Sequence, residues 1–238
     1  MIWIQKTLPQ IKEIQIEDDT FTCERQWVLE LCSALRGKGI VWSCCSPHDL
    51  PGDVLAKMKE AGVRNLVVGF ESGNDDILKR VRKGVNTQQA KEFMKECRQV
   101  GLRVHGCFVF GLPGETLGTM LQTLEFALKL RPDTVQFAIA SAYEGTAFNK
   151  YLREHCYLRD SAGVTSAGNL TARYDYPDVS RDAINAFAHK AWKSYYWRPS
   201  TILRQIHSAL TNLQDAKRFA RGFTYLGQYM FMNQPHEQ

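Results

Sequence analysis

The chain has 238 residues, of which 44% are hydrophobic, and a formal net charge of +5. This length suits one substantial domain with an extension. No apolar run approaches the roughly 18 residues of a membrane-spanning helix, and the N-terminus lacks the pattern of a signal peptide, so we expect a cytoplasmic globular protein. The whole positive excess lies in residues 179–238, which carry 8 Lys or Arg and 3 Asp or Glu.

Five short apolar runs predict buried strands. They cover residues 11–18, 40–45, 65–72, 103–111 and 134–140. The segments between them carry apolar residues at spacings of three and four, which is typical of amphipathic helices. Strand and helix in alternation predict a parallel sheet with right-handed crossovers.

Several expected helices have recognisable ends. Thr87 and Thr116 are candidate N-caps, and Gly62 and Gly101 are candidate C-caps. Ser180 is expected to cap a further helix near the start of the basic C-terminal region. These signals separate the helices from the strands that flank them.

Polar residues gather directly after the strands, in the stretches "EDDTF", "SCCSPHD", "ESGND" and "GLPGET". A doubly wound sheet and a barrel both fit the alternation, but this clustering after the strands favours a barrel, whose active site lies at that end. We therefore predict an α/β fold, an incomplete (βα) barrel with a C-terminal helical appendage. Its parts are the partial barrel 1–153, a linker or lid 154–178 and a helical region 179–238.

Two groups of carboxylates stand at strand ends. Glu17, Asp18 and Asp19 form a cluster suited to a metal, an ammonium group or acid–base chemistry, although Asp19 or Thr20 could simply cap the next helix. Glu71 follows a buried run directly, where a carboxylate can accept hydrogen bonds from the two hydroxyls of a ribose. The plainer interpretation makes Glu71 an exposed turn residue beside a helix capped by Asn74.

The stretch "GLPGET", residues 111–116, combines two glycines with a helix start. Such glycines let the backbone approach a flat ligand closely. His105 lies within the preceding strand and can point into a barrel, though a lone strand histidine is more often packed and hydrogen-bonded. The seven cysteines include no C-x-x-C pair, and Cys32 and Cys97 fit apolar helix faces, so we expect reduced thiols.

Taken in order, "EDDTF", "WSC", "GFESGNDDILKRVRKG", "VHGCFVFGLPGET" and "YEGTAF" resemble the successive strand-end motifs of radical S-adenosylmethionine (SAM) enzymes. The likeness is greatest to the branch that often carries a cobalamin-binding domain, and within it to hopanoid-biosynthesis enzymes of the bacteriohopanetetrol cyclitol ether synthase type. It covers nearly the whole chain. It implies the radical SAM type of barrel.

The resemblance also implies roles for particular residues. Glu71 matches the residue that contacts the ribose of SAM, the acidic turn matches the position that receives the methionine amino group, and Ser43 lies near the methionine moiety. Val109 and Gly111, at the end of the fourth run, match the adenine-contacting region together with Tyr143. Together the implied cofactor contacts are Glu17, Asp18, Asp19, Ser43, Glu71, Ser72, Val109, Gly111 and Tyr143.

One departure from the family pattern concerns the iron–sulfur cluster. Family members hold a four-iron four-sulfur cluster with a C-x-x-x-C-x-x-C triplet after the first barrel strand, and these 238 residues contain no such triplet. Five strands are expected where the family has six, and the missing unit is the one that carries the cluster. The chain therefore corresponds to a C-terminal portion of such an enzyme, with no metal ligands of its own and its cluster supplied by an N-terminal portion or a partner.

The resemblance implies a 5′-deoxyadenosyl radical acting on a lipid-linked sugar, with cobalamin as a further candidate cofactor. The basic, aromatic C-terminal region would then favour an amphipathic lipid substrate and a peripheral position at the inner membrane surface, with no nucleic-acid partner. Two alternatives stay open. One is a catalytically silent binding module or truncated barrel, and the other is an unrelated barrel using Glu17, Asp18, Asp19 and Glu71 for metal or acid–base chemistry.

Overall fold

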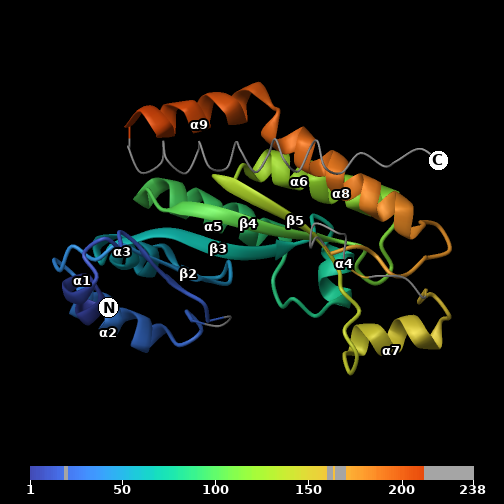
Figure 1. Cartoon of the computed structure of the whole chain (residues 1–238), viewed down its shortest axis with the longest axis horizontal. Coiled ribbons are helices and arrows are strands. Elements are labelled where there is room, and N and C mark those ends of the chain that lie inside the picture. Colours follow the sequence, from blue (N-terminus) through green and yellow to red (C-terminus); the bar gives the residue numbers. More distant parts are fainter. Residues whose placement is uncertain (19–20, 160–162, 164–169, 212–238) are drawn as a thin grey trace.

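The computed structural model describes residues 1–18, 21–159, 163 and 170–211, and the account that follows is limited to these (Figure 1). Five strands form one parallel sheet in the order β1-β2-β3-β4-β5, which is also their order along the chain. The strands are β1 (Ile14–Ile16), β2 (Trp42–Cys45), β3 (Val63–Glu71), β4 (Arg103–Phe110) and β5 (Thr134–Ile139). Each lies within an expected run except β3, which begins two residues earlier.

Helices connect successive strands, as a parallel sheet requires. The connecting helices are α2 (Arg25–Leu35), α3 (Gly52–Glu60), α4 (Asp75–Arg80), α5 (Thr87–Val100) and α6 (Leu117–Leu130). Helix α1 (Ile2–Thr7) precedes the sheet, and α7 (Ala147–Glu154), α8 (Arg181–Tyr196) and α9 (Pro199–Thr211) follow it. In Figure 1, α4 and α7 lie at the right, at the end of the sheet where the strands finish, and α6, α8 and α9 lie above the sheet. None of the described helices is long and apolar enough to cross a bilayer.

The cap residues of the helices agree with the predictions at some ends and differ at others. Thr116 caps α6 by accepting a bond from the Thr119 N–H, and Gly101 ends α5 in the left-handed region, as predicted. The prediction for Thr87 is wrong by one residue, because Asn86 caps α5 and exchanges bonds with Gln89 in a capping box.

Two other cap assignments also change. Ala61 is the C-cap of α3, and Gly62 follows it with a positive φ of 93°. The suggestion that Asp19 or Thr20 caps the next helix is wrong, because α2 begins after Glu24.

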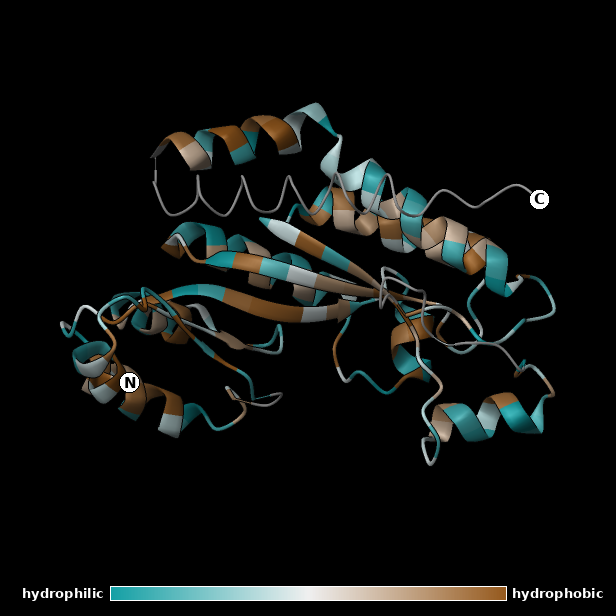
Figure 2. Cartoon of the chain, in the orientation of Figure 1, coloured by the Kyte–Doolittle hydropathy of each residue, from teal (hydrophilic) through white to brown (hydrophobic). Residues whose placement is uncertain are grey.

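The two faces of the sheet differ in burial. Residues of β4 alternate along the strand, with Val104, Gly106, Phe108 and Phe110 buried on the side covered by helices. Phe108 packs between Phe70 and Phe137 with ring centroids 5.6 Å from each. Figure 2 shows hydrophobic and hydrophilic colours in turn along β4 and β5 and along the helices, as expected of elements with one buried side.

We call the opposite side of the sheet the inner face. Its half-buried or exposed residues follow the same alternation along the strands. They are Cys45, Asn65, Val67, Gly69, His105, Cys107, Val109, Thr134, Gln136 and Ala138. A parallel sheet with helices on its outer side and a polar inner face confirms the predicted incomplete (βα) barrel.

The start of the C-terminal helical region is part of the helix layer. In α8, Phe187 meets the ring of Phe110 edge-on at 5.1 Å, and Tyr195 packs against Phe137. The Tyr196 hydroxyl accepts a bond from the Val135 N–H at 2.9 Å and donates to the Val135 carbonyl at 2.8 Å, which satisfies the outer edge of β5. The term appendage therefore does not suit α8, whose side chains complete the core.

The segment 154–178, expected to be a linker or lid, contributes to the same core where it is described. Tyr174 is 0% exposed and Tyr176 is 7% exposed. Short bridges join Leu158 to Tyr174 and Tyr176 to Val179. Burial of two tyrosines fixes the end of this segment against the barrel.

Candidate functional site

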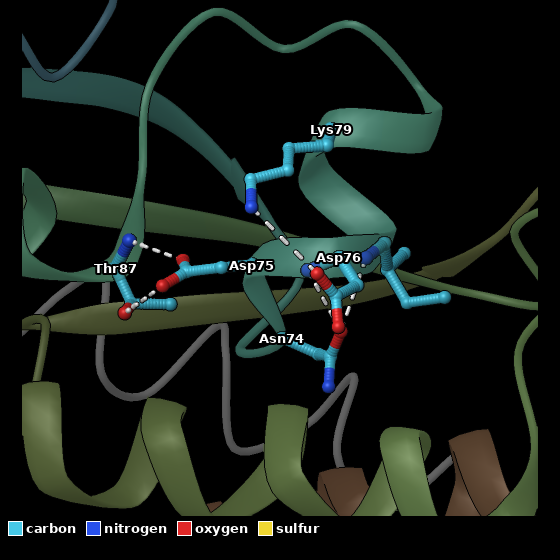
Figure 3. A network of polar contacts seen from close by, with 6 residues as sticks. Asn74, Asp75, Asp76, Lys79 and Thr87 are labelled. Carbon is cyan, nitrogen blue, oxygen red and sulfur yellow. Dashed lines mark hydrogen bonds and ion pairs between the residues drawn. The ribbon is translucent and has the colours of Figure 1, made fainter.

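The candidate site lies at the edge of the sheet where the parallel strands end. The turn after β3 is built by side chains that bond its backbone (Figure 3). Asn74 accepts bonds from the N–H groups of Asp76 and Ile77, both at 3.0 Å, and so caps α4. Asp75 accepts a bond from the Thr87 N–H at 2.8 Å, which ties the start of α4 to the start of α5. These bonds fix the backbone of the segment that follows Glu71.

Glu71 and Ser72 end β3 in different surroundings. Glu71 has a positive φ of 62°, and the pairing of β3 with β4 shifts register next to it, so the strand ends in an irregularity at this residue. Ser72 is fully buried, and its hydroxyl lies 3.1 Å from the Thr123 hydroxyl of α6. Ser72 therefore joins the turn to α6.

The Glu71 carboxylate forms an ion pair with Lys83, with Oε1 2.8 Å from Nζ and both side chains about one quarter exposed. The pair lies over Gly69, where an added Cβ would come within 2.3 Å of Glu71 Oε1 and 3.0 Å of Lys83 Nζ. Sequence reasoning missed Lys83, which lies 12 residues after Glu71. The basic run "RVRKG" marked a cationic segment but did not show which side chain returns to the strand end.

The loop "GLPGET" after β4 is held by two buried tyrosines. The Tyr174 hydroxyl is shared between the carbonyl oxygens of Gly111 and Ala140, each at 2.9 Å, and the Tyr176 hydroxyl donates to Gly111 at 2.9 Å. Gly111 has a φ of 78°, and a Cβ there would lie 2.3 Å from Tyr174 Oη. The close approach that this glycine permits is therefore made by the protein's own tyrosine.

The second glycine of the loop has a similar explanation. A Cβ on Gly114 would collide with the guanidinium of Arg80, at the end of α4. The loop after β4 thus packs against the helix that follows β3. Because the two strand-end loops are in contact, the position of either one depends on the other.

Glu115 is a buried carboxyl within the same loop and was not singled out from the sequence. It is 2% exposed, and its Oε2 accepts a bond from the Leu112 N–H at 3.0 Å, while Oε1 has no hydrogen-bond partner among the described residues. Burial raises its pKa to about 7, and the N–H groups of Leu112 and Gly111 oppose that rise. A carboxyl at this place can gain or lose a proton near neutral pH.

Ser43 lies below the strand-end rim. It is level with Gln15 of β1 and Asn65 of β3, and its hydroxyl donates to Glu13. Glu13 also pairs with Arg64, with 2.8 Å between Oε2 and Nη1. The structure therefore places Ser43 in a polar group near the start of the sheet, two residues before β2 ends.

The remaining expected contacts are spread along the rim. Glu17 and Asp18 are exposed after β1, and Asp19 lies outside the described residues. Val109 is half-buried near the end of β4, and Tyr143 is 64% exposed after β5. The structure brings Glu71, Gly69 and Lys83 into contact.

The cysteines do not fit a four-iron four-sulfur cluster. Cys32, Cys44 and Cys97 are buried on three different elements, and burial raises their pKa values to about 11, 12 and 12, so the thiols stay protonated. Within the described ranges, no group of three or more His, Cys, Asp or Glu side chains could hold a metal ion. Cluster ligands would have to come from outside these residues.

Residues 4–127 match the protein-family model described as Radical SAM superfamily. An uncharacterized methyltransferase of Pyrococcus horikoshii is 30% identical over 199 residues, which are 82% of this chain and 43% of that protein. Cytidylyl-2-hydroxyethylphosphonate methyltransferase of Streptomyces wedmorensis is 27% identical over 146 residues, 57% of this chain and 27% of that protein. The chain thus spans less than half the length of these curated relatives.

Solved structures share the fold. The radical SAM methyltransferase TsrM from Kitasatospora setae, with tryptophan substrate and a SAM analogue bound, matches with a TM-score of 0.61 at 16% identity over 84% of this chain and 46% of that one. Coproporphyrinogen III oxidase from Escherichia coli, described as a radical SAM enzyme, matches with a TM-score of 0.56 at 16% identity over 76% of this chain and 41% of that one.

Proposed function

Because the chain belongs to the radical SAM superfamily, we propose that its strand-end loops form the SAM-binding part of a radical SAM methyltransferase. The cofactors of this superfamily are SAM and a four-iron four-sulfur cluster, and TsrM has been solved with cobalamin also bound. Family membership removes the alternative of an unrelated acid–base or metal-dependent barrel. Methyl transfer is the activity named for both curated relatives described above.

The observation that carries the proposal is the Glu71–Lys83 pair at the end of β3. A half-buried carboxylate held beside a glycine can accept bonds from two adjacent hydroxyls, as acidic residues do with a ribose. The ion pair with Lys83 holds this carboxylate in one orientation before a ligand arrives. The pair faces the inner side of the sheet, next to Cys107.

The loop at Gly111 would orient the base of the same ligand. Its backbone is held by Tyr174 and Tyr176, so the half-buried side chains of Val109 and Leu112 have a defined position beside it. A flat apolar surface next to fixed backbone groups suits a purine ring. This assignment keeps Val109 and Gly111 in the roles that their motif implies.

The cluster would supply the electron that cleaves SAM, and its ligands would come from an N-terminal portion or a separate partner. We propose that the chain alone binds SAM weakly, since the iron that chelates the methionine end is missing. An alternative is that the chain acts as a binding module without catalysis. A test is to supply a segment with a C-x-x-x-C-x-x-C motif, as a fusion or in trans, and to measure 5′-deoxyadenosine; none would form in the binding-module case.

The SAM site can be tested by calorimetry on the full chain. Glu71→Gln should weaken SAM binding about tenfold or more, because an amide oxygen is a poorer acceptor than a carboxylate and loses the pairing with Lys83. Glu60→Gln is the matched control, since Glu60 pairs with Arg36 at the surface of α3. Equal affinity of Glu71→Gln and wild type would show that Glu71 has another role.

The finer assignments from the motif resemblance stay proposals. They are a hopanoid-related, lipid-linked sugar as substrate and a peripheral position at an anionic membrane. Lys190 and Lys193 are exposed on α8 and Trp197 is 54% exposed, which supports a surface role for these three side chains.

Other members of the C-terminal region are already engaged in the fold. Arg198 donates to the Leu128 carbonyl and Arg204 to the Pro132 carbonyl, so their loss would disturb the barrel. The aromatic residues after 211 lie outside the described residues. The sharper membrane test therefore changes Lys190 and Lys193 together to Gln and measures cosedimentation with anionic vesicles at low and high salt. Unchanged vesicle binding would leave no membrane role for these lysines.

A further inference from the structure

The inner face carries a band of neutral polar side chains between two ion pairs. The Glu71–Lys83 pair lies at the end of the strands, and the Glu13–Arg64 pair lies near their start. Arg103, near the start of β4, bonds the Ser208 hydroxyl of α9. In the two ion pairs each positive charge faces a negative one, and Arg103 bonds a hydroxyl of α9, so these charged groups lie at the two ends of the band.

Four residues of β4 and β5 form the centre of this band. The strand register places His105 opposite Thr134 and Cys107 opposite Gln136. His105 Nδ1 lies 2.7 Å from the Thr134 hydroxyl, and Cys107 Sγ lies 3.9 Å from Gln136 Oε1. Gln136 is the most exposed of the four. The side chains thus form two neighbouring polar pairs, and the amide of Gln136 is accessible.

All four side chains are uncharged at neutral pH. Burial lowers the pKa of His105, so the imidazole is neutral and offers one donor and one acceptor. Burial raises the pKa of Cys107 to about 11, with Glu71 and Cys45 adding to the rise, so the thiol keeps its proton. The group therefore presents donors and acceptors together, without a net charge.

This chemistry selects among ligand classes. The four side chains include no cation to compensate a phosphate or carboxylate, and a hydrocarbon would cover the exposed Gln136 amide without offering it a hydrogen bond, each of which costs binding energy. A group with several hydroxyls can donate and accept at once and so satisfies both. We infer that the His105, Cys107, Thr134 and Gln136 side chains form a subsite for a neutral, hydroxyl-bearing group such as a sugar ring.

The position of the subsite links it to the proposed cofactor site. Cys107 is paired in register with Gly69, and the Glu71–Lys83 pair lies over Gly69. A hydroxyl-bearing group on these four residues would therefore lie beside the carboxylate assigned to the ribose of SAM. The assignment of this hydroxyl-bearing group to the substrate rests on the proposed function. Its binding to the four side chains depends only on the inner face.

The test uses the full chain and methyl β-D-glucopyranoside as the probe. NMR of the imidazole Cε1–Hε1 signal of His105, assigned with His105→Gln, should show a saturable shift with the glucoside and a much smaller one with glucose 6-phosphate. Gln136→Leu should weaken glucoside binding at least tenfold. Thr134→Val, the second variant, should also weaken it. Gln26→Leu, which removes a surface pair with Glu30 on α2, is the matched control.

Thermal unfolding of each variant shows whether it is folded. No saturable shift with the glucoside, equal or tighter binding of glucose 6-phosphate, or a folded Gln136→Leu that binds as wild type would each overturn the inference. Calorimetry with SAM is run separately. Glucoside binding without SAM binding would contradict the proposed function and support the subsite. SAM binding without glucoside binding would support the proposed function and overturn the subsite.

Discussion

The hydroxyl of Tyr174 lies 2.9 Å from the carbonyl oxygen of Gly111, from which it is separated by 63 residues of sequence. The same hydroxyl would lie 2.3 Å from a Cβ on residue 111, so the tyrosine fills the space that the glycine leaves. The loop after β4 and the last part of the segment 154–178 are thus fixed by one buried contact.

Removing the Tyr174 hydroxyl should loosen the loop. In Tyr174→Phe the buried Ala140 carbonyl loses its bond, while Gly111 keeps the bond from Tyr176, so we expect a loss of about 2 kcal/mol in the free energy of unfolding. Urea unfolding measures this loss, and Tyr143→Phe, at an exposed position, is the control. A Tyr174→Phe variant as stable as the control would show that the shared hydroxyl contributes nothing net.

A side chain at residue 111 should be more costly than this lost hydroxyl. Gly111→Ala would require a positive φ for alanine and would displace Tyr174 from the core. We expect unfolding to become easier by more than 2 kcal/mol, in the range reported for overpacked sites. Gly145→Ala also has a positive φ but no atom within 4 Å of the added Cβ, so it separates the backbone cost from the collision. Equal losses in the two variants would argue against the collision.

Glu115 should make stability depend on pH in a defined direction. Burial raises its pKa from the ordinary 4.5 to about 7 in the fold, so the protonated form is favoured and its contribution is complete below about pH 4.5. The contribution is lost as the pH rises to about 7. Glu115→Gln stays neutral, and its unfolding free energy relative to wild type should rise by about 3 kcal/mol between pH 4.5 and 8. Parallel pH profiles for the two proteins would contradict this.

His48 should make stability depend on pH in the direction opposite to Glu115. The ring is 1% exposed and packs on Phe70 with centroids 5.2 Å apart, and burial, followed by the charge of Lys83, lowers its pKa to about 4. The neutral ring is favoured in the fold, so its contribution is complete above pH 6.5 and is lost as the pH falls through about 4. His48→Phe should flatten the decline between pH 6.5 and 4, measured by denaturant unfolding. His207→Phe, with its ring on α9, is the control.

The chain alone should hold no stable cluster after anaerobic reconstitution with iron and sulfide. No three cysteines have the required spacing, and the buried thiols keep their protons. Iron analysis after desalting and electron paramagnetic resonance are the measurements. A stoichiometric signal that survives desalting would require cysteines to come together in a way that the described residues do not show.

Local sequence patterns determined the five strands, most of the helices and their order. Alternating burial along "RVHGCFVF" and the cap at Thr116 follow from a few neighbouring residues, because periodicity and capping depend on backbone geometry within one element. The same patterns identified Glu71 as the carboxylate at the end of β3. They missed by one residue at Thr87, since Asn86 and Thr87 are both capping residues and the capping box decides between them.

Only the tertiary structure decided which distant groups meet at the strand ends. Lys83 reaches Glu71, and Tyr174 and Tyr176 reach Gly111 from 63 and 65 residues away. Glu115 was part of an identified motif, yet its burial and the rise in pKa that burial causes exist only in the folded loop, beside Tyr174. Periodicity indicates which face of an element is buried, but the partner on that face is set by how separate elements pack, which no local pattern encodes.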